Sequence, residues 1–510
     1  MQLIRKFIFI YILLKIYSRK NNLIYSDLNF KKLDFTNYKQ IKSFIFKKNF
    51  YKLQNKNVQS FDFLNFSKNL GGKIGINYSK KSIFDWNKVN KGKFNYPWTE
   101  DLSSRRLINL LYNYEFINSS STKQETYLLN KIILNHVHRV IYDFNSKKIY
   151  SITSYDLVAY VLSCLILDRF SEKDSKYLDF ITISQIDKLG MHKSYNILEH
   201  VKYVNNLSEI KNILLFFKVN ISKNIEDTYI KMTSILNEYF HDDGSIPLFN
   251  GSNNNYTKTI SESINREEYL KSRKYEDNVN GIAFYKDKNK KIFFDVVQPN
   301  KDKISNNLNA GTLSFEFSSF GEKIITNCGA SESFGKNPEY LRYSAAHSTI
   351  ILQNTNISEI KENNPHIKFP QSVKFNLFSK NNRTIFEGSH NGYARKFKKI
   401  VKRTLFIDND SNKIRGEDAI ISLQNNNDRI IYHIRFHLVD GISYNFTNSK
   451  KNVILRTKSK NIWIFKSDVE LVIEDSIFVD NNKTIPTKQI VIKGVINNIK
   501  QTRKWSLEKQ

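Results

Sequence analysis

Residues 312–327 read TLSFEFSSFGEKIITN, which is two runs of alternating apolar and polar side chains separated by a glycine. Alternation with period two is typical of β-strands, and glycine is typical of the turn between them. Similar runs recur from residue 281 onwards, as in GIAFY (281–285), KIFFDVV (291–297), RTIFEG (383–388), KKIVKRTLFI (398–407), RIIYHIRFHL (429–438), NVILRTK (452–458), NIWIFKS (461–467), LVIED (471–475) and QIVIKGVI (489–496). So many strands at this spacing predict one large antiparallel β-sandwich.

The stretch that precedes these strands has helical spacing instead. Thr122 stands three residues before Glu125, which is the pattern of a capping box. Apolar residues then follow at helical intervals over 127–144. Further helices are predicted over 154–170, 196–215 and 225–240. The sequence therefore predicts an α+β protein with a helical part followed by a β-sandwich.

Both periodicities fade between residues 250 and 280, and we expect the domain boundary there. We predict a helical domain over 23–265 and a β-sandwich domain over 275–510. Residues 1–22 contain only a short apolar stretch between basic residues, whereas a helix needs about 20 residues to span a bilayer. They form either an export signal or interfacial anchor, or an ordinary first helix. No other segment has the pattern of a transmembrane span.

The composition is that of a globular protein. At about 100–200 residues per domain, 510 residues are enough for two to four folded units. Hydrophobic residues at 40% and charged residues at 25% exclude both a disordered polymer and a membrane bundle. The two cysteines, Cys164 and Cys328, are too few for a disulfide framework.

The chain is strongly basic, with 79 Lys and Arg against 49 Asp and Glu and a net charge of +30. Such an excess attracts polyanions of any kind, although it is also what a solvated, lysine-rich surface would give. A nucleic-acid-binding protein would concentrate its cations in a stripe, an arm or a recognition motif. The sequence has short basic runs such as 396–399 but no such concentration. We therefore expect no nucleic-acid partner.

Residues 307–360 carry a more specific pattern. An LSFE strand (313–316), an Asn-Cys-Gly turn (327–329) and an Ala-His-Ser-Thr strand (346–349) occur in this order. The pattern resembles the β-domain signature of the heparinase II/III-like family of polysaccharide lyases. Other fragments agree with the family in the same order, namely PWTEDLSSRRLINLL (97–111), GMHKSYN (190–196), HDDGSIPLFNG (241–251), HNGYARKF (390–397), RGED (415–418), RFHL (435–438) and RKWSL (503–507).

The resemblance implies a fold, a reaction and a partner. The fold is an incomplete (α/α) toroid followed by an antiparallel β-sandwich. The reaction is cleavage of a uronic-acid glycoside by β-elimination, which consumes no water. Because the C5 proton is weakly acidic until the neighbouring carboxylate is neutralised, the site needs a neutralising group, a base and an acid. The implied partner is an acidic, uronic-acid-containing polysaccharide, and the implied location is the cell envelope or periplasm, with the cytoplasm as the alternative.

The resemblance also implies candidate catalytic residues. His347 stands where the family carries the histidine of its β-domain, unless backbone partners satisfy it within a strand. Asn135 and His136 resemble the Asn-His pair with which family members neutralise the uronate and assist proton transfer. Asn-His is a weak signal in a chain so rich in Asn. Glu316, within the LSFE strand, is either a cleft acid or a residue on the solvent face of the strand.

Four further residues are predicted to bind substrate. His192, within GMHKSYN, matches the Gly-His segment of the family, with structural capping as the alternative. Arg342 would hold a substrate carboxylate through two parallel hydrogen bonds, unless it is a solvated surface residue. Asn309 lies in the loop before the LSFE strand. Tyr393 and, as a second candidate, Tyr195 stand in for a tyrosine that the family usually carries after the Gly-His segment.

The sequence departs from the family at one loop. Metal-binding members have a His-x-His-x-Asp loop, whereas this chain reads NLNAG (307–311), and the later Asp-x-Gly has become Asn327-Cys328-Gly329. Neutral amides bind zinc poorly, so we expect no tightly bound metal and no cofactor. No histidine partner can be named for Cys328, which favours a buried hydrophobic role. The departure also leaves open a non-catalytic protein of this fold that binds acidic glycan in envelope assembly or export.

Overall fold

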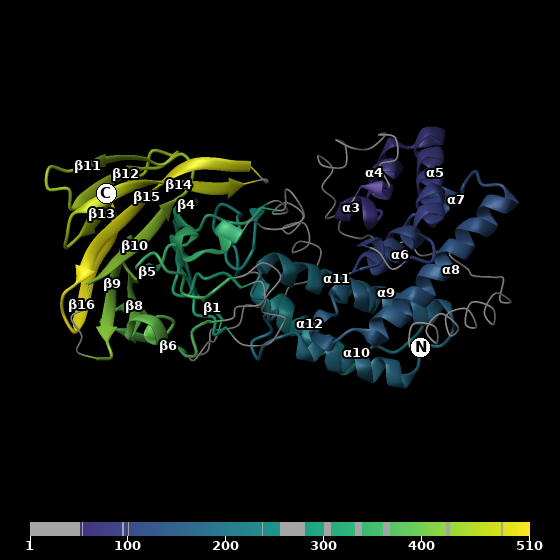
Figure 1. The fold of residues 1–510 in the computed structure, drawn as a ribbon, viewed down its shortest axis with the longest axis horizontal. Helices are drawn as coiled ribbons and strands as arrows, with labels where there is room; N and C mark the ends of the chain where they lie inside the picture. The colour runs from purple at the N-terminus through teal and green to yellow at the C-terminus, as the bar shows by residue number, and fades with distance from the viewer. Residues whose placement is uncertain are drawn as a thin grey trace. The chain divides into compact units, whose positions relative to one another are not determined.

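The structure, a computed structural model, describes residues 52–53, 55–93, 96–99, 101–236, 238–254, 281–299, 308–331, 339–360, 368–424, 429–480 and 483–510. These residues form two compact units. The first comprises the described residues up to Gln185 together with Lys202–Tyr229. The second comprises Ile186–Val201 and the described residues from Ile230 to Gln510. The first unit is helical, and the second holds the β-strands (Figure 1).

The beginnings of the helices are set by capping residues. Thr122, Thr153 and Ser171 each cap a helix in a capping box, in which the side chain accepts from the N–H three residues on. A cap gives partners to N–H groups that have none within the helix, so it fixes where the helix begins. The helices are α3 (Lys56–Gln59), α4 (Phe63–Leu70), α5 (Gly72–Asn90), α6 (Leu102–Tyr112), α7 (Tyr114–Asn118), α8 (Lys123–Ser146), α9 (Ser154–Ile166), α10 (Glu172–Ser184), α11 (Ile197–Phe216) and α12 (Lys223–Leu236).

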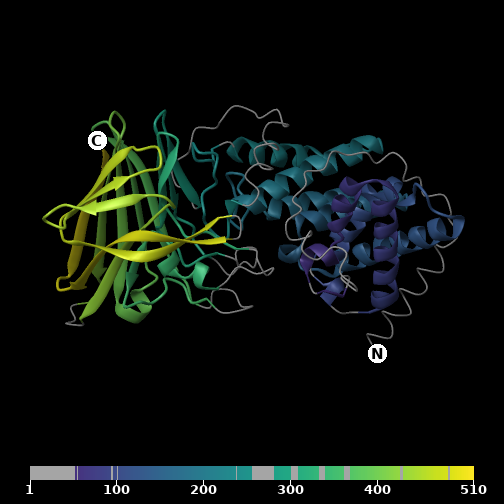
Figure 2. The same ribbon diagram turned by 90° about the horizontal axis from the view of Figure 1, so that it is seen from above.

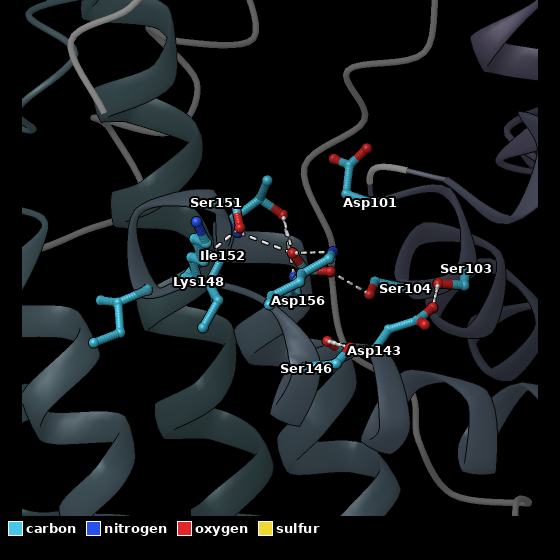
Figure 3. A network of polar contacts seen from close by, with 12 residues as sticks. Asp101, Ser103, Ser104, Asp143, Ser146, Lys148, Ser151, Ile152 and Asp156 are labelled. Carbon is cyan, nitrogen blue, oxygen red and sulfur yellow. Dashed lines mark hydrogen bonds and ion pairs between the residues drawn. The ribbon is translucent and has the colours of Figure 1, made fainter. Parts of the chain in front are cut away.

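Buried polar contacts join α6, α8 and α9 (Figure 3). Asp156 of α9 accepts a hydrogen bond from Ser104 of α6 at 2.5 Å and pairs with Lys147 at 2.7 Å. Ser103, the neighbour of Ser104, donates to Asp143 of α8 at 3.1 Å. Burial raises the pKa of Asp156, and Lys147 opposes this shift. Because such contacts are directional, they hold the three helices at defined positions.

The second unit holds two antiparallel sheets (Figures 1 and 2). One has the strand order β1-β2-β3-β4-β10-β15-β14, with β5 paired to β10, and the other has the order β11-β12-β13-β16-β9-β8-β7-β6. The strands are β1 (Ile282–Lys286), β2 (Lys290–Asp295), β3 (Phe315–Ser319), β4 (Glu322–Thr326), β5 (Ile350–Leu352), β6 (Val373–Lys380), β7 (Arg383–His390), β8 (Lys399–Asp408), β9 (Lys413–Ser422), β10 (Ile430–Leu438), β11 (Ser443–Phe446), β12 (Asn452–Arg456), β13 (Ile462–Ser467), β14 (Leu471–Asp480), β15 (Lys483–Ile496) and β16 (Lys500–Lys509). Short helical segments are η6 (Glu339–Arg342), η7 (Ser344–Ala346) and α14 (Ala394–Phe397).

Apolar side chains of both sheets form one core between them. Phe315 of β3 stacks on Trp505 of β16 with ring centroids 5.5 Å apart, and Phe317 meets Trp463 of β13 edge-on at 5.5 Å. Alternate residues of a strand point to opposite faces, so these rings account for one face of β3. The other face carries Glu316, and it is buried as well. Of the two alternatives for Glu316, the solvent face is therefore wrong, because β3 is covered on both sides.

The predicted fold class is confirmed, since a helical region precedes an antiparallel β-sandwich. The helices expected over 196–215 and 225–240 correspond to α11 and α12, although α12 ends earlier, at Leu236. Helices α3 to α5 lie within the predicted helical domain, but their individual limits were not predicted, because Lys and Asn residues interrupt the apolar pattern there. Strand β9 was also missed, because Gly416 and Asp418 occupy two of its inward positions.

Two expectations lie outside the described residues. The signal, anchor or first helix over 1–22 is one of them, and the boundary near 265–275 is the other. The domain limits 23–265 and 275–510 therefore stay a prediction. In the part of the chain that the structure describes, no helix has both the length and the apolar character needed to cross a membrane.

Candidate functional site

His347 lies directly after η7, in extended backbone that leads to β5. It is 1% exposed, and neither ring nitrogen has a hydrogen-bond partner among the described residues. Burial lowers the pKa of His347 to about 4, and the charge of Glu316 opposes this shift. The imidazole is therefore neutral at pH 7 and has an uncommitted lone pair, as a general base requires.

The ring of His347 rests on the backbone of Gly311. A Cβ atom at residue 311 would lie 2.9 Å from Cγ of His347 and 3.1 Å from its Cδ2. These distances are shorter than ordinary van der Waals contact, so a side chain at residue 311 would displace the ring. The loop over 308–311 and the extended segment that carries His347 are therefore in direct contact.

Arg342 and Asn309 belong to the same cluster of loops. Arg342 donates from Nη2 to the carbonyl oxygen of Leu308 at 3.3 Å, and its own carbonyl oxygen accepts from the N–H of Ala310 at 2.9 Å. Ser344 donates its hydroxyl to the carbonyl oxygen of Ala310 at 2.6 Å. Asn309 is 5% exposed, and within the described ranges its side-chain oxygen has no hydrogen-bond partner. The cluster thus holds a cation and a buried amide oxygen.

Asn250 joins the segment of His192 to this cluster. It accepts from the N–H of Asn309 at 3.0 Å and donates from Nδ2 to the carbonyl oxygen of Tyr195 at 3.3 Å. Asn196 donates to the carbonyl oxygen of Asn250 at 3.0 Å. Burial lowers the pKa of His192 to about 4. The structure therefore brings together the segments that carry His192, Asn309, Arg342 and His347, all within the second unit.

Two of the predicted substrate-binding residues have structural contacts. His192 accepts at Nδ1 from the N–H of Ser194 at 3.2 Å, which closes a turn. Tyr393 is buried in the sandwich core and donates its hydroxyl to the carbonyl oxygen of Thr355 at 2.9 Å. Burial raises the pKa of Tyr393 above its usual range. Contact of either residue with a substrate stays a prediction.

Left-handed backbone is found at three non-glycine residues of these segments. Tyr195, Asn250 and Leu313 have φ angles of 50°, 51° and 63°. Residues in sparsely populated regions cost about 1–3 kcal/mol each and persist only where the surroundings determine them.

The hydroxyl of Tyr195 is hydrogen-bonded to Asp187, and burial, followed by this carboxylate, raises the pKa of Tyr195. A tyrosine hydroxyl thus belongs to the segment of His192.

Asn135 and His136 lie on α8, in the helical unit. His136 is buried and accepts at Nε2 from Nε of Arg106 at 3.0 Å. Its Nδ1 therefore carries the proton, which it donates to the carbonyl oxygen of Ile132 at 2.9 Å. Burial, followed by the charge of Arg106, lowers the pKa of His136 to about 3. Joint action of this pair with His347 stays a prediction.

The residues at the metal positions of the family do not fit a zinc ion. Asn327 is committed elsewhere, since its Oδ1 accepts from the N–H of Ser348 at 3.0 Å and its Nδ2 donates to Glu316 at 3.1 Å. One imidazole, His347, and one amide oxygen, Asn309, remain, whereas zinc sites use at least three strong protein ligands. No group of three or more His, Cys, Asp or Glu suited to a metal ion occurs in the described part of the chain.

Sequence reasoning missed two sets of buried partners. Cys328 has its Sγ 3.7 Å from Nδ1 of His437. Burial raises the pKa of Cys328 to about 12, so the thiol stays protonated and is a poor nucleophile. Glu316 forms a buried ion pair with Lys323 at 3.0 Å. The one local signal for this pair was a charged residue in an alternating strand, between Phe315 and Phe317.

Known proteins share this fold. The family model described as heparinase II/III-like, C-terminal, matches residues 278–506. A solved structure of heparinase III is 11% identical, and the match covers 98% of this chain and 89% of the other with a TM-score of 0.71. Heparan sulfate lyase HepC from Pedobacter heparinus is 12% identical, with 90% and 77% covered and a TM-score of 0.61. A search of curated proteins finds no match.

At these identities the solved structures establish the fold alone. They cover both the helical region and the sandwich, as the resemblance implied, and the family model covers most of the second unit. The predicted resemblance is therefore confirmed. Residues 278–506 thus match the C-terminal domain model of the heparinase II/III-like family.

Proposed function

We propose that this protein is a polysaccharide lyase that cleaves a uronate-containing acidic polysaccharide by β-elimination. The observation that carries the proposal is the state of His347, which is buried and neutral and has no hydrogen-bond partner for either ring nitrogen among the described residues. A buried polar group without a partner is costly unless a ligand pairs with it. The guanidinium of Arg342, in the same cluster of loops, suits a carboxylate, and the unpaired side-chain oxygen of Asn309 suits a donor such as a sugar hydroxyl.

In the proposed reaction, His347 takes the proton from C5 of the uronate. Arg342 neutralises the substrate carboxylate, which makes that proton more acidic. The electron pair left at C5 forms the double bond to C4, and the bond from C4 to the glycosidic oxygen breaks. The leaving oxygen takes a proton from an acid, for which Tyr195 is the candidate. A substrate carboxylate beside His347 would also raise its pKa and help it to hold the proton.

We place the protein in the cell envelope or periplasm, with an acidic polysaccharide as its partner. The net charge of +30 supports a polyanionic partner, although it does not select one polymer. Substrate contacts of His192 and Tyr393 are part of the same proposal.

The proposal is tested with alginate, polyglucuronate, heparan sulfate and chondroitin, by following the ultraviolet absorbance of an unsaturated uronate. His347→Ala is compared with the wild type and with His390→Ala, which removes an equally buried histidine from β7 in the other sheet. We expect product from the wild type and from His390→Ala, and none from His347→Ala. Binding to one polymer without product from any of them would refute the lyase and favour a non-catalytic glycan-binding protein.

A further inference from the structure

Glu316, on the covered face of β3, is fully buried, and hydrogen-bond donors surround its carboxylate. Oε1 accepts from the N–H of Leu248 at 3.0 Å, and from the backbone N–H and Nδ2 of Asn327, both at 3.1 Å. Oε2 accepts from Lys323 and from Nε2 of His241, both at 3.0 Å. One side chain of β3 thus joins the adjoining strand and turn over 323–327 to the segment over 241–248, which lies 68–75 residues away in the sequence.

The carboxylate is ionised in spite of its burial. Burial raises the pKa of Glu316, but Lys323 and His241 more than offset this effect and the pKa is lowered to about 2. His241 is neutral, because burial lowers its pKa to about 4. Its Nε2–H therefore donates to Glu316, while Nδ1 accepts from the hydroxyl of Ser318 at 2.7 Å. The cluster is one ion pair surrounded by neutral donors.

A first arm of this network leads from Glu316 to the loop of Asn309. Leu248, whose N–H is bound by Glu316, lies two residues before Asn250. Asn250 in turn binds the N–H of Asn309 and the carbonyl oxygen of Tyr195, as described above. The position of the loop over 308–311 therefore depends on the segment that Glu316 holds.

A second arm leads from Glu316 to His347. Asn327 donates two N–H groups to Glu316 and accepts at Oδ1 from the N–H of Ser348 at 3.0 Å. Ser348 follows His347 directly, and its hydroxyl donates to the carbonyl oxygen of Thr326 at 2.7 Å. The backbone that carries the imidazole is thus bound, through one amide side chain, to the carboxylate of Glu316.

We propose that Glu316 is a positioning residue, which fixes the loop of Asn309 and the backbone of His347 relative to one another. This inference rests on the proposed function, in which Asn309 and His347 act on one substrate. Glu316 acts through its neighbours, because its side chain is buried and both its oxygens are occupied. A carboxylate suits this task, because its two oxygens accept several hydrogen bonds from different directions.

The test must separate placement from stability, because any buried ion pair contributes to folding. Glu316→Gln keeps the size of the side chain but replaces one accepting oxygen with an amide group, so part of the network loses its acceptor. Asn327→Ala removes the second arm and leaves the ion pair of Glu316 with Lys323 intact. Asp287→Asn is the control. It removes the charge of a carboxylate that pairs with another buried lysine, since Oδ2 of Asp287 lies 2.7 Å from Nζ of Lys290.

Two measurements on the full-length protein report the placement. Nitrogen-15 NMR of labelled histidine follows the ring of His347, with its signal assigned from His347→Gln. Hydrogen–deuterium exchange follows peptides over 308–314 and 344–350. In Glu316→Gln we expect a shifted His347 signal and exchange about tenfold faster in both peptides, because their anchoring hydrogen bonds are lost. In Asn327→Ala only the His347 signal and the peptide over 344–350 should change, and in Asp287→Asn neither should.

An unchanged His347 signal in Asn327→Ala would overturn the proposal, and so would an equal change in the Asp287→Asn control. If Glu316→Gln does not fold, Asn327→Ala still tests the proposal, because this variant keeps the ion pair between Glu316 and Lys323. Neither measurement needs turnover. Failure to detect lyase activity would therefore refute the proposed function separately from the positioning role.

Discussion

Replacement of Gly311 by alanine tests how closely the ring of His347 is held. The added Cβ would lie 2.9, 3.1 and 3.2 Å from Cγ, Cδ2 and Nδ1 of that ring. Carbon atoms pack best at about 3.5–4.0 Å, so either the ring or the loop must move by a few tenths of an ångström or more. Gly311 is outside the left-handed region, so alanine adds no backbone strain there. The expected cost is that of overpacking, about 1–3 kcal/mol of unfolding free energy.

This cost should disappear when the ring is absent. In the His347→Ala background the three atoms that the new Cβ would meet are gone, so a double-mutant cycle should give a coupling of about 1–3 kcal/mol. Urea unfolding followed by tryptophan fluorescence measures the free energies. Gly392→Ala is the matched control, because its Cβ would meet Ile357 at the same 2.9 Å, and it should show no coupling to His347. A cost of Gly311→Ala that persists in the His347→Ala background would refute the packing of this ring on the loop.

Asp418→Asn should destabilise the sandwich by about 3–5 kcal/mol in urea unfolding, because it leaves Arg403 buried without the carboxylate 2.7 Å away. Thr122→Ala should cost about 1 kcal/mol in the same assay, since it removes the acceptor at the first turn of α8. Acid should destabilise the protein, because the pKa values of His347 and Glu316, about 4 and about 2, lie below those of the unfolded chain. In acid the unfolded state binds more protons than the folded state, so the free energy of unfolding falls. The contribution of His347 to this free energy is lost from about pH 6.5 down to 4, and that of Glu316 from about pH 4.5 down to 2. A urea midpoint that rises on acidification would contradict this sign. A chelator should leave the melting temperature unchanged, since the donors at the metal positions do not fit zinc, and a fall of several degrees would refute that expectation.

Most of the sandwich could be predicted because its strands alternate, and β9 shows where alternation fails. Gly416 occupies an inward position that only glycine can fill, because a Cβ there would lie 2.1 Å from the ring of Trp505. Asp418 faces inward because Arg403 and the indole N–H of Trp505, at 2.7 and 2.9 Å, bind its carboxylate. In a short stretch of sequence, glycine and aspartate usually indicate a loop rather than the inward face of a strand. Their partners are distant in the sequence, so no window of neighbouring residues could reveal them.

In the candidate site, too, some residues could be predicted from the local sequence and others could not. His347 could be located from the sequence, because the motif that marks it is a continuous stretch, residues 346–349. Asn250 could not, since it acts on Tyr195 and Asn309, which are 55 and 59 residues away. A charge in an alternating strand usually indicates a solvent face, and for Glu316 this was misleading because the segment over 241–248 covers that face.

Buried polar atoms without a partner occur at several places in the described part of the chain, but among its histidines only His347 has both ring nitrogens unpaired. In the described part of the chain, both ring nitrogens of His347 and the side-chain oxygen of Asn309 are buried without a hydrogen-bond partner. Each such group costs about 1–3 kcal/mol. The same unit pairs Glu316 and Asp418 with buried cations and further donors, so this fold does supply partners to buried charges. We infer that a polar ligand completes the groups of His347 and Asn309. Both a lyase and a glycan-binding protein would bind such a ligand, and transfer of the C5 proton to His347 is the step that separates them.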